Sequence, residues 1–139
     1  RYSDCHIVSH NKTTMISYSI NQPLDIIKYS KKDEVIGIDE TQFFDDSIVT
    51  VCKELASNGK RVIVAGLDTD YRGIPFGPMP DIMCEAEYLD KLRAICIICG
   101  NPASYTQRKS NNLEQVLIGE LDKYEARCRN CFQPPDITK

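Results

Sequence analysis

The first half of the chain alternates short apolar runs with amphipathic segments. Residues 35–38 form one continuous apolar run that follows four charged residues at 31–34, which predicts a strand covered on both faces. Residues 62–67 form a second such run. Strand, helix and strand of this length predict a right-handed βαβ crossover in a parallel sheet. Both strands then end at the same edge of the sheet, where α/β proteins bind ligands.

The segment between the two runs predicts a helix. Asp45 or Asp46 is placed to cap its first turn and residues 58–59, Asn-Gly, are placed to end it. Apolar residues recur within it at three- and four-residue spacing, namely Ile48, Val49, Cys52, Leu55 and Ala56. Shorter helices are predicted over residues 22–29 and 81–89.

Four of the seven cysteines form two Cys-x-x-Cys pairs, which are Cys96/Cys99 and Cys128/Cys131. Two such pairs are typical of a closed tetrahedral zinc site, and this site is expected to be structural because a catalytic zinc keeps one coordination position open. Residues 100–127 separate the pairs and exceed the usual zinc-ribbon spacer of about 15–20 residues. The sequence therefore predicts a long loop that leaves the metal and returns to it.

Two disulfides or buried thiols are the alternative for these cysteines. No apolar stretch approaches the roughly 18–20 residues of a membrane helix and no secretory segment is seen, so we expect a cytoplasmic protein. Paired Cys-x-x-Cys units more often bind metal than oxidise in that compartment. The remaining Cys5, Cys52 and Cys84 are expected to fill core space as small apolar residues.

Composition limits the number of domains and the classes of partner. With 139 residues and 42% hydrophobic composition, the chain has room for one core and a small metal-stabilised appendage. We expect an α/β core over residues 1–93 and a zinc-binding subdomain over 94–139, with short strands around 92–95 and 116–118. The net charge of −3 and the lack of any cluster of Lys and Arg argue against a protein that binds duplex nucleic acid.

An acidic pair, Asp39-Glu40, ends the first predicted strand. Proteins that handle phosphate place a magnesium ligand and a second carboxylate at this point, because the divalent ion needs a rigidly held oxygen and the attacking hydroxyl needs a proton acceptor. The alternative is a solvated turn, which is common after a strand.

Several motifs follow one another in a fixed order. They are Asp39-Glu40-Thr41-Gln42-Phe43-Phe44, Gly66-Leu67-Asp68 with the loop 71–78, and residues 123–131, preceded by Arg1-Tyr2-Ser3 and Val8-Ser9-His10. Together with the four cysteines they closely resemble the type II thymidine kinases, over nearly all of the chain. The resemblance implies a P-loop-type parallel sheet with helices on both faces, which forms a nucleotide-binding core, plus a small zinc-ribbon or lasso subdomain.

The resemblance also implies an activity, which is transfer of the γ-phosphate of ATP to the 5′-hydroxyl of thymidine. It makes Asp39 the carboxylate that supports Mg²⁺, Glu40 the general base, and Thr41, Gln42 and Arg1 their neighbours at the phosphates. It assigns the thymidine site to Phe43, Leu67, Tyr71, Phe76, Thr106, Val116, Leu117, Ile118, Gly119 and Tyr124. Tyr71 stands where some members of the family have Phe.

Two features depart from the family pattern. The chain has no P-loop of the form G-x-x-x-x-G-K-[ST], whose amides and lysine hold ATP phosphates. In the family this loop lies on the first strand, so we expect that strand to precede Arg1. The lasso between Lys109 and Val116 is also shorter than is usual in the family.

The resemblance further implies a homotetramer that dTTP inhibits by feedback, with no nucleic-acid or membrane partner. Two other classes remain as alternatives. A zinc-ribbon module that binds nucleic acid or protein would show a basic face, which the net acidity does not favour. A helicase-like ATPase would share the D-E-x-Q form of residues 39–42, but it needs a Ser-Ala-Thr segment and an arginine-bearing second domain, and the chain has neither.

Overall fold

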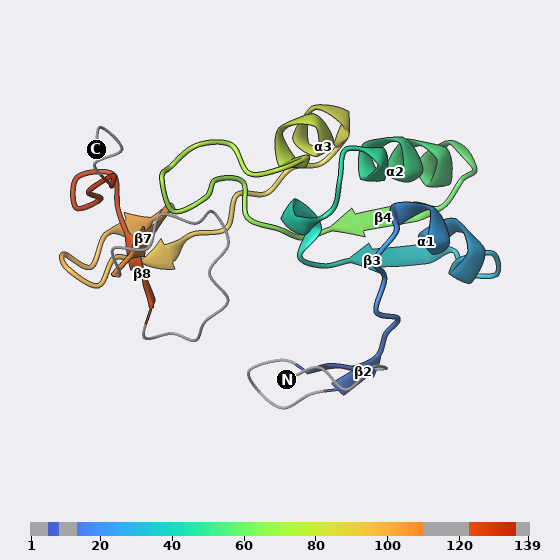
Figure 1. Ribbon diagram of the computed structural model, residues 1–139, viewed down its shortest axis with the longest axis horizontal. Coiled ribbons are helices and arrows are strands. Elements are labelled where there is room, and N and C mark those ends of the chain that lie inside the picture. The colour runs from blue at the N-terminus through green and yellow to red at the C-terminus, as the bar shows by residue number, and fades with distance from the viewer. Residues whose placement is uncertain (1–5, 9–13, 110–122, 136–139) are drawn as a thin grey trace.

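Two structural parts follow one another along the chain in the computed structural model, which describes residues 6–8, 14–109 and 123–135 (Figure 1). The first part holds three α-helices, one short 3-10 helix and two strand pairs, and the second is a module of short strands. The elements of the first part are β1 (His6–Val8), β2 (Thr14–Ile16), α1 (Pro23–Tyr29), β3 (Val35–Ile38), η1 (Thr41–Phe43), α2 (Ser47–Ser57), β4 (Arg61–Val64) and α3 (Met79–Glu85). Those of the second are β5 (Ala94–Ile95), β6 (Pro102–Ala103), β7 (Tyr105–Arg108) and β8 (Tyr124–Arg127).

The parallel pair β3–β4 confirms the predicted strand-helix-strand unit, in the register Val35 to Arg61 through Ile38 to Val64. Two backbone hydrogen bonds continue the pairing beyond the strand ends, because the N–H of Ala65 donates to Ile38 and the N–H of Thr41 donates to Ala65. The turn that follows β3 is therefore fixed to the carboxyl edge of the sheet. The short hairpin β1–β2 was not predicted from the sequence.

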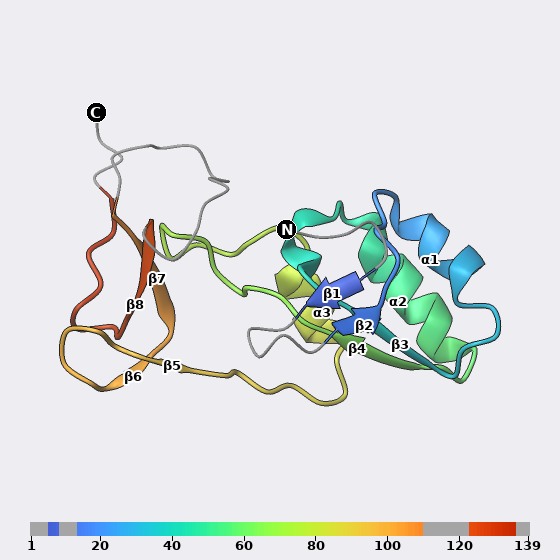
Figure 2. The same ribbon diagram turned by 90° about the horizontal axis from the view of Figure 1, so that it is seen from below.

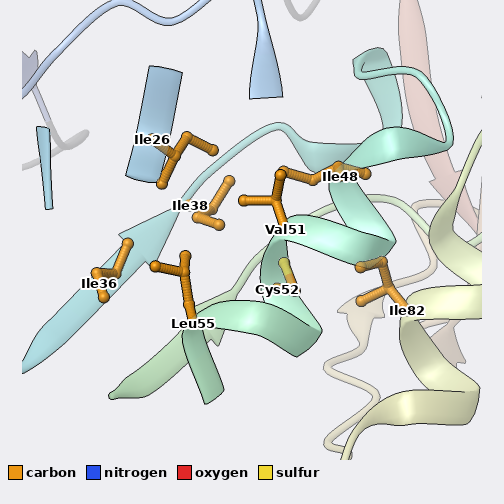
Figure 3. Packing of buried hydrophobic residues seen from close by; sticks show 8 residues of the cluster. All are labelled: Ile26, Ile36, Ile38, Ile48, Val51, Cys52, Leu55 and Ile82. Atoms are coloured by element: carbon orange, nitrogen blue, oxygen red, sulfur yellow. The ribbon is translucent and has the colours of Figure 1, made fainter. Parts of the chain in front are cut away.

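Burial of aliphatic side chains between the helices and one face of the sheet builds the core. Ile36 and Ile38 point from β3 toward α2 (Figure 3). Eight side chains form this cluster, which are Ile26, Ile36, Ile38, Ile48, Val51, Cys52, Leu55 and Ile82. Each buried aliphatic side chain contributes about 1.5–3 kcal/mol. Cys52 fills core space as predicted, but Cys84 is exposed, which corrects the expectation for that residue, and Cys5 lies outside the described residues.

The other face of the sheet differs from the prediction of strands covered on both sides. Val35 is 55% exposed and Ile63 is 51% exposed, whereas Ile36 and Ile38 are buried. Helices α1, α2 and α3 each contribute to the one cluster that covers the buried face, so the described residues show α-helices on that face only.

The ends of the helices follow the predicted local chemistry with small shifts. Asp45 accepts a hydrogen bond of 2.9 Å from the N–H of Ser47, the first residue of α2, whereas Asp46 at the N-cap position makes no side-chain cap hydrogen bond. Gly59 adopts a φ of 79° just past the end of that helix. Helix α3 covers 79–85 instead of 81–89, because Pro80 fits a first turn and Ala86 is already extended. Among the described residues, every helix is too short or too polar to cross a membrane.

The second part is a module of two antiparallel strand pairs, β5–β6 and β7–β8. The predicted strand at 92–95 is confirmed only at 94–95, and the one at 116–118 lies outside the described residues. The loop between β4 and α3 reaches from the first part to the module in both views (Figures 1 and 2). This loop is the main link between the two parts besides the chain that follows α3.

Candidate active site and metal centre

The acidic turn after β3 has an unusual backbone. Glu40 has φ 53° and ψ 36°, in the left-handed region, and it is the one residue other than glycine with positive φ in the described part of the chain. Asp39 stabilises the turn, because its Oδ1 accepts a hydrogen bond of 2.9 Å from the N–H of Glu40. Both side chains are exposed. Strained backbone of this kind concentrates at functional sites, since the surrounding structure must hold it in place.

Gln42 connects the acidic turn to the loop after β4. Its Nε2 donates to Oε2 of Glu40 at 2.6 Å, and its Oε1 accepts from the N–H of Leu67 at 3.1 Å. The residue is only 3% exposed, so both groups of its side-chain amide are held away from bulk water. Gln42 thus orients the Glu40 carboxylate and fixes the backbone of Leu67 in one arrangement.

Two glycines make room for Gln42. A β-carbon at Gly66 would lie 2.8 Å from Gln42 Oε1 and 2.9 Å from the sulfur of Met79. A β-carbon at Gly77 would lie 2.4 Å from the backbone oxygen of Gln42, and Gly77 also has a φ of 50°. A larger residue at 77 would displace backbone, so the close approach of these loops requires glycine there.

Two aromatic residues predicted for the nucleoside site meet beside the acidic turn. The rings of Phe43 and Phe76 form an edge-to-face pair with centroids 5.6 Å apart. Phe76 is buried, but Phe43 is 56% exposed and Leu67 is 46% exposed. Exposed apolar side chains next to positioned polar groups are typical of a ligand site.

The loop after β4 contains a rigid turn around Asp70. Its carboxylate accepts from the N–H of Arg72 at 2.8 Å and from the guanidinium of Arg72 at 2.8 and 2.6 Å. Burial acts to raise the pKa of Asp70, but its hydrogen bonds from Arg72 outweigh burial and lower that pKa below its ordinary value. The N–H of Gly73 donates to the backbone oxygen of Asp70, and a φ of 76° at Gly73 closes the turn.

Tyr71 projects from this turn and is 4% exposed. Arg108 of β7 lies over its ring, and the same arginine donates a 2.8 Å hydrogen bond to the hydroxyl of Tyr124 on β8. The structure therefore brings two predicted nucleoside-site tyrosines together through an arginine that the sequence reasoning missed. An arginine in a short polar strand carries no sequence signal for this role.

The remaining predicted residues make other contacts or lie outside the described residues. Thr106 is half-buried on β7, paired with Ala126 of β8. Thr41 is fully buried and its hydroxyl lies 3.4 Å from the backbone oxygen of Ile38, which indicates a structural contact. Arg1 and the predicted base-binding segment, Val116, Leu117, Ile118 and Gly119, lie outside the described residues.

The four paired cysteines converge at one point in the module. The sulfurs of Cys96, Cys99, Cys128 and Cys131 all lie within 4.8 Å of one another, and those of Cys99 and Cys128 are 3.5 Å apart. Four sulfur donors at this separation suit a single tetrahedral metal ion such as zinc. The prediction of a shared metal site by these four residues is confirmed at the level of geometry.

Backbone amides around the sulfurs favour thiolates, the form that binds metal. Burial acts to raise the pKa of Cys96, but N–H groups from Cys128, Cys99 and Ile98 hold that pKa lower, at about 6. Hydrogen bonding with Cys128 and Cys99 raises the pKa of Cys131 to about 12. The surroundings therefore favour the thiolate form of Cys96 and the protonated form of Cys131.

Comparison with known proteins agrees with the motif resemblance. The family model described as thymidine kinase matches residues 1–132. A thymidine kinase of Rhodothermus sp. (strain ITI 518) is 49% identical over 138 residues, which are 99% of this chain and 65% of that protein. A thymidine kinase of Bacteroides fragilis (strain ATCC 25285) is 47% identical over 133 residues, or 96% and 67% of the two chains. One of Bacteroides thetaiotaomicron is 46% identical over 132 residues, or 95% and 66%. The chain thus spans about two thirds of the length of these curated relatives, and 65% of the first of them.

Proposed function

This chain belongs to the thymidine kinase family, and we propose that its protein transfers the γ-phosphate of ATP to the 5′-hydroxyl of thymidine to give dTMP. One structural observation supports this activity independently of the similarity to named thymidine kinases. The carboxylate of Glu40 is oriented by Gln42 at the carboxyl edge of a parallel strand pair, next to the exposed ring of Phe43. A positioned carboxylate beside an aromatic surface suits activation of a nucleoside hydroxyl.

The proposed reaction assigns different work to the two carboxylates. Glu40 accepts the proton of the 5′-hydroxyl as that oxygen bonds to the γ-phosphorus and ADP leaves with the bridging oxygen. Asp39 is the residue that would hold the Mg²⁺ that accompanies ATP, since its exposed carboxylate supplies hard oxygen ligands. Bound Mg²⁺ would supply charge neutralisation at the phosphates.

We assign the nucleoside to the surface that Phe43 and Leu67 leave exposed, with Phe76 packed behind Phe43. Tyr71, Thr106, Tyr124 and the segment 116–119 complete the proposed site from the module side. This assignment follows the family resemblance, and the proximity of Tyr71 to Tyr124 supports it.

We propose zinc as the resident ion of the four-cysteine site, with a structural role. Four sulfur donors leave no position open for a reacting water, and soft thiolate ligands favour zinc over Mg²⁺. The zinc would hold the two ends of the long loop between Cys99 and Cys128 together.

The remaining parts of the proposal rest on the family resemblance. They are an α/β nucleotide-binding part over 1–93 that belongs to a P-loop-type sheet with helices on both faces, a lasso subdomain over 94–139, and Arg1 near the reacting phosphate. They also include a cytoplasmic homotetramer that dTTP inhibits. The half-exposed face of β3–β4 supports the first of these, because further elements on that face would bury Val35 and Ile63.

Magnesium-dependent phosphate transfer from ATP to thymidine tests the proposal, with the full-length gene product and with deoxycytidine as the comparison acceptor. Glu40→Gln is expected to lower kcat by about 10²–10⁴-fold, the contribution typical of a general base. Its side-chain oxygen still accepts a hydrogen bond from Gln42, so thymidine affinity measured by calorimetry should hold.

The matched control is Glu54→Gln, which removes the same charge from an exposed position on α2 and should leave turnover unchanged. Near-normal turnover of Glu40→Gln would reassign the base. Absence of transfer to either nucleoside by the unmodified protein would reject the kinase proposal and favour a zinc-ribbon binding module.

A further inference from the structure

Arg108 joins the two parts of the molecule through a buried guanidinium. It is the last residue of β7 and is 6% exposed. Its guanidinium carbon lies 3.6 Å from the ring centroid of Tyr71 and 5.3 Å from that of Tyr124. Its Nη2 also donates to the Tyr124 hydroxyl at 2.8 Å. One side chain therefore contacts an aromatic residue from each part.

Only arginine can make both contacts in this geometry. The planar guanidinium stacks on an aromatic face and still directs N–H donors sideways, whereas a lysine ammonium is a compact point charge on a flexible stem. Burial removes water from the contact, which strengthens the attraction between the cation and the ring. The observed arrangement thus depends on the shape of the side chain as well as its charge.

A second contact beside the first keeps the Asp70 turn against the module. The stacked rings of Tyr105 and Phe132 have centroids 4.6 Å apart. A β-carbon at Gly73 would lie 3.3 Å from the Phe132 ring and 3.5 Å from the Tyr105 ring, so the turn packs directly on this pair. Because Asp70 ties Arg72 and Gly73 into one turn, the contact of Gly73 with these rings also holds Tyr71 beside the module.

We propose that Arg108 is a positioning residue for nucleoside binding, which fixes Tyr71 of the α/β part and Tyr124 of the metal module at one separation. The inference rests on the proposed function and deepens it, because both tyrosines belong to the proposed thymidine site. Arg108 acts through these tyrosines and needs no contact with the substrate. The metal module then organises the loop of the α/β part as well as its own segment between the cysteine pairs.

Steady-state kinetics of the full-length, zinc-loaded protein test this role. Arg108→Met keeps the length of the side chain but removes the planar cation and its hydrogen bond, and we expect KM for thymidine to rise about tenfold with kcat within about threefold. KM for ATP should not change. Arg108→Lys, which restores the charge and a donor but not the stacking plane, should give an intermediate KM.

Lys109→Met is the matched control, because it removes one positive charge from the next residue of the same segment, whose side chain is exposed. It should leave both KM values unchanged. Equal KM values for Arg108→Met and the unmodified protein would overturn the inference. So would a loss of bound zinc or a parallel rise of both KM values, since either result indicates a general structural role.

Hydrogen exchange gives a readout that does not depend on catalysis. The amides of Arg72, Gly73 and Ile74 point into the Asp70 turn, and we expect Arg108→Met to speed their exchange while the amides of α2 stay protected. Unchanged exchange in the turn would reject the link itself. Faster exchange in a protein that does not phosphorylate thymidine would retain the link and reject only the proposed function.

Discussion

The α/β part and the metal module are stabilised in different ways. The first buries eight side chains in a continuous cluster, of which Ile48, Val51 and Leu55 are no more than 2% exposed. In the described residues of the module, the corresponding buried cluster consists of Cys96, Ala103 and Cys128, with the partly buried Ala126 and Cys131 packed against it. Burial of apolar area accounts for the first cluster, but three small residues cannot offset the entropy of ordering a whole module.

Exposed isoleucines of the module show the same contrast. Ile95 is 65% exposed, and Ile97 and Ile98 are each 59% exposed. Residues that build the core in one part of the chain thus remain in contact with solvent in the other. From this difference we expect that a strand module this small depends on a bound metal, because the free energy of metal binding is then also free energy of folding.

Loss of a metal ligand should have the largest effect on folding. It should unfold the metal module and leave the α/β part folded. Cys128→Ser is expected to abolish zinc binding and unfold β5–β8, because structural zinc contributes about 10–16 kcal/mol in small zinc domains. Helices α1 to α3 should persist. Zinc content by mass spectrometry and amide exchange by NMR would measure both effects.

Cys84→Ser serves as the control for that experiment, since it removes an exposed thiol outside the metal site. Loss of protection in α2 together with β7 would show that the two parts fold as one unit. The α/β part and the metal module would then not be stabilised independently.

A cavity in the aliphatic core should destabilise the α/β part and leave the metal module intact. Leu55→Ala removes a side chain that is 2% exposed, and it should lower the free energy of unfolding of the α/β part by about 2–5 kcal/mol. Urea denaturation followed by far-ultraviolet circular dichroism measures that loss. Zinc content should be retained.

Leu24→Ala is the matched control, because Leu24 is 62% exposed on α1 and its truncation should change stability by less than about 0.5 kcal/mol. A parallel loss of zinc in Leu55→Ala would contradict independent stabilisation of the two parts.

The smallest change in the free energy of unfolding is expected for substitution of Asp70, in the loop between the parts. Its pKa in the folded state is below the ordinary value of 3.8, so it stabilises the fold above that pH and the contribution disappears as the pH falls through its lowered pKa. At neutral pH Asp70→Asn should cost about 1–3 kcal/mol. The difference from the unmodified protein should stay constant well above pH 3.8 and should shrink as the pH is lowered through 3.8 toward the lowered pKa of Asp70.

Asp90→Asn, which changes an exposed carboxylate in the chain after α3, is the matched control for removal of a negative charge. A constant difference between Asp70→Asn and the unmodified protein at all pH values would assign the effect to packing and not to charge.

Local chemistry predicted the parts of the fold that depend on nearby residues. The strand at 35–38, the hydrogen bond of Asp45 at the start of α2 and the left-handed Gly59 just past its end each follow from a few neighbouring residues, and the structure shows all three. The exposed face of the sheet and the exposure of Cys84 were not predicted, because they depend on which distant segments cover a surface.

In the candidate site too, the features set by local sequence were predicted and those that depend on distant contacts were not. The cysteine spacing predicted the metal centre, since four identical ligands in two pairs are a strong pattern. Residue type placed Glu40 and Gln42 in one turn, but it did not predict that Gln42 bonds both Glu40 and Leu67. Arg108 could not be found, because its role depends on contact between residues that are far apart in the chain.

The left-handed backbone of Glu40 has a consequence for protein engineering. An L-residue with a side chain costs about 1–2 kcal/mol in that conformation, while glycine adopts it freely and asparagine tolerates it better. A library selected for thermal stability alone should therefore enrich glycine at position 40 and discard the proposed base. The most stable sequence of this chain and the most active one are expected to differ at that residue, so a stability screen of this family member needs an activity filter from its first round.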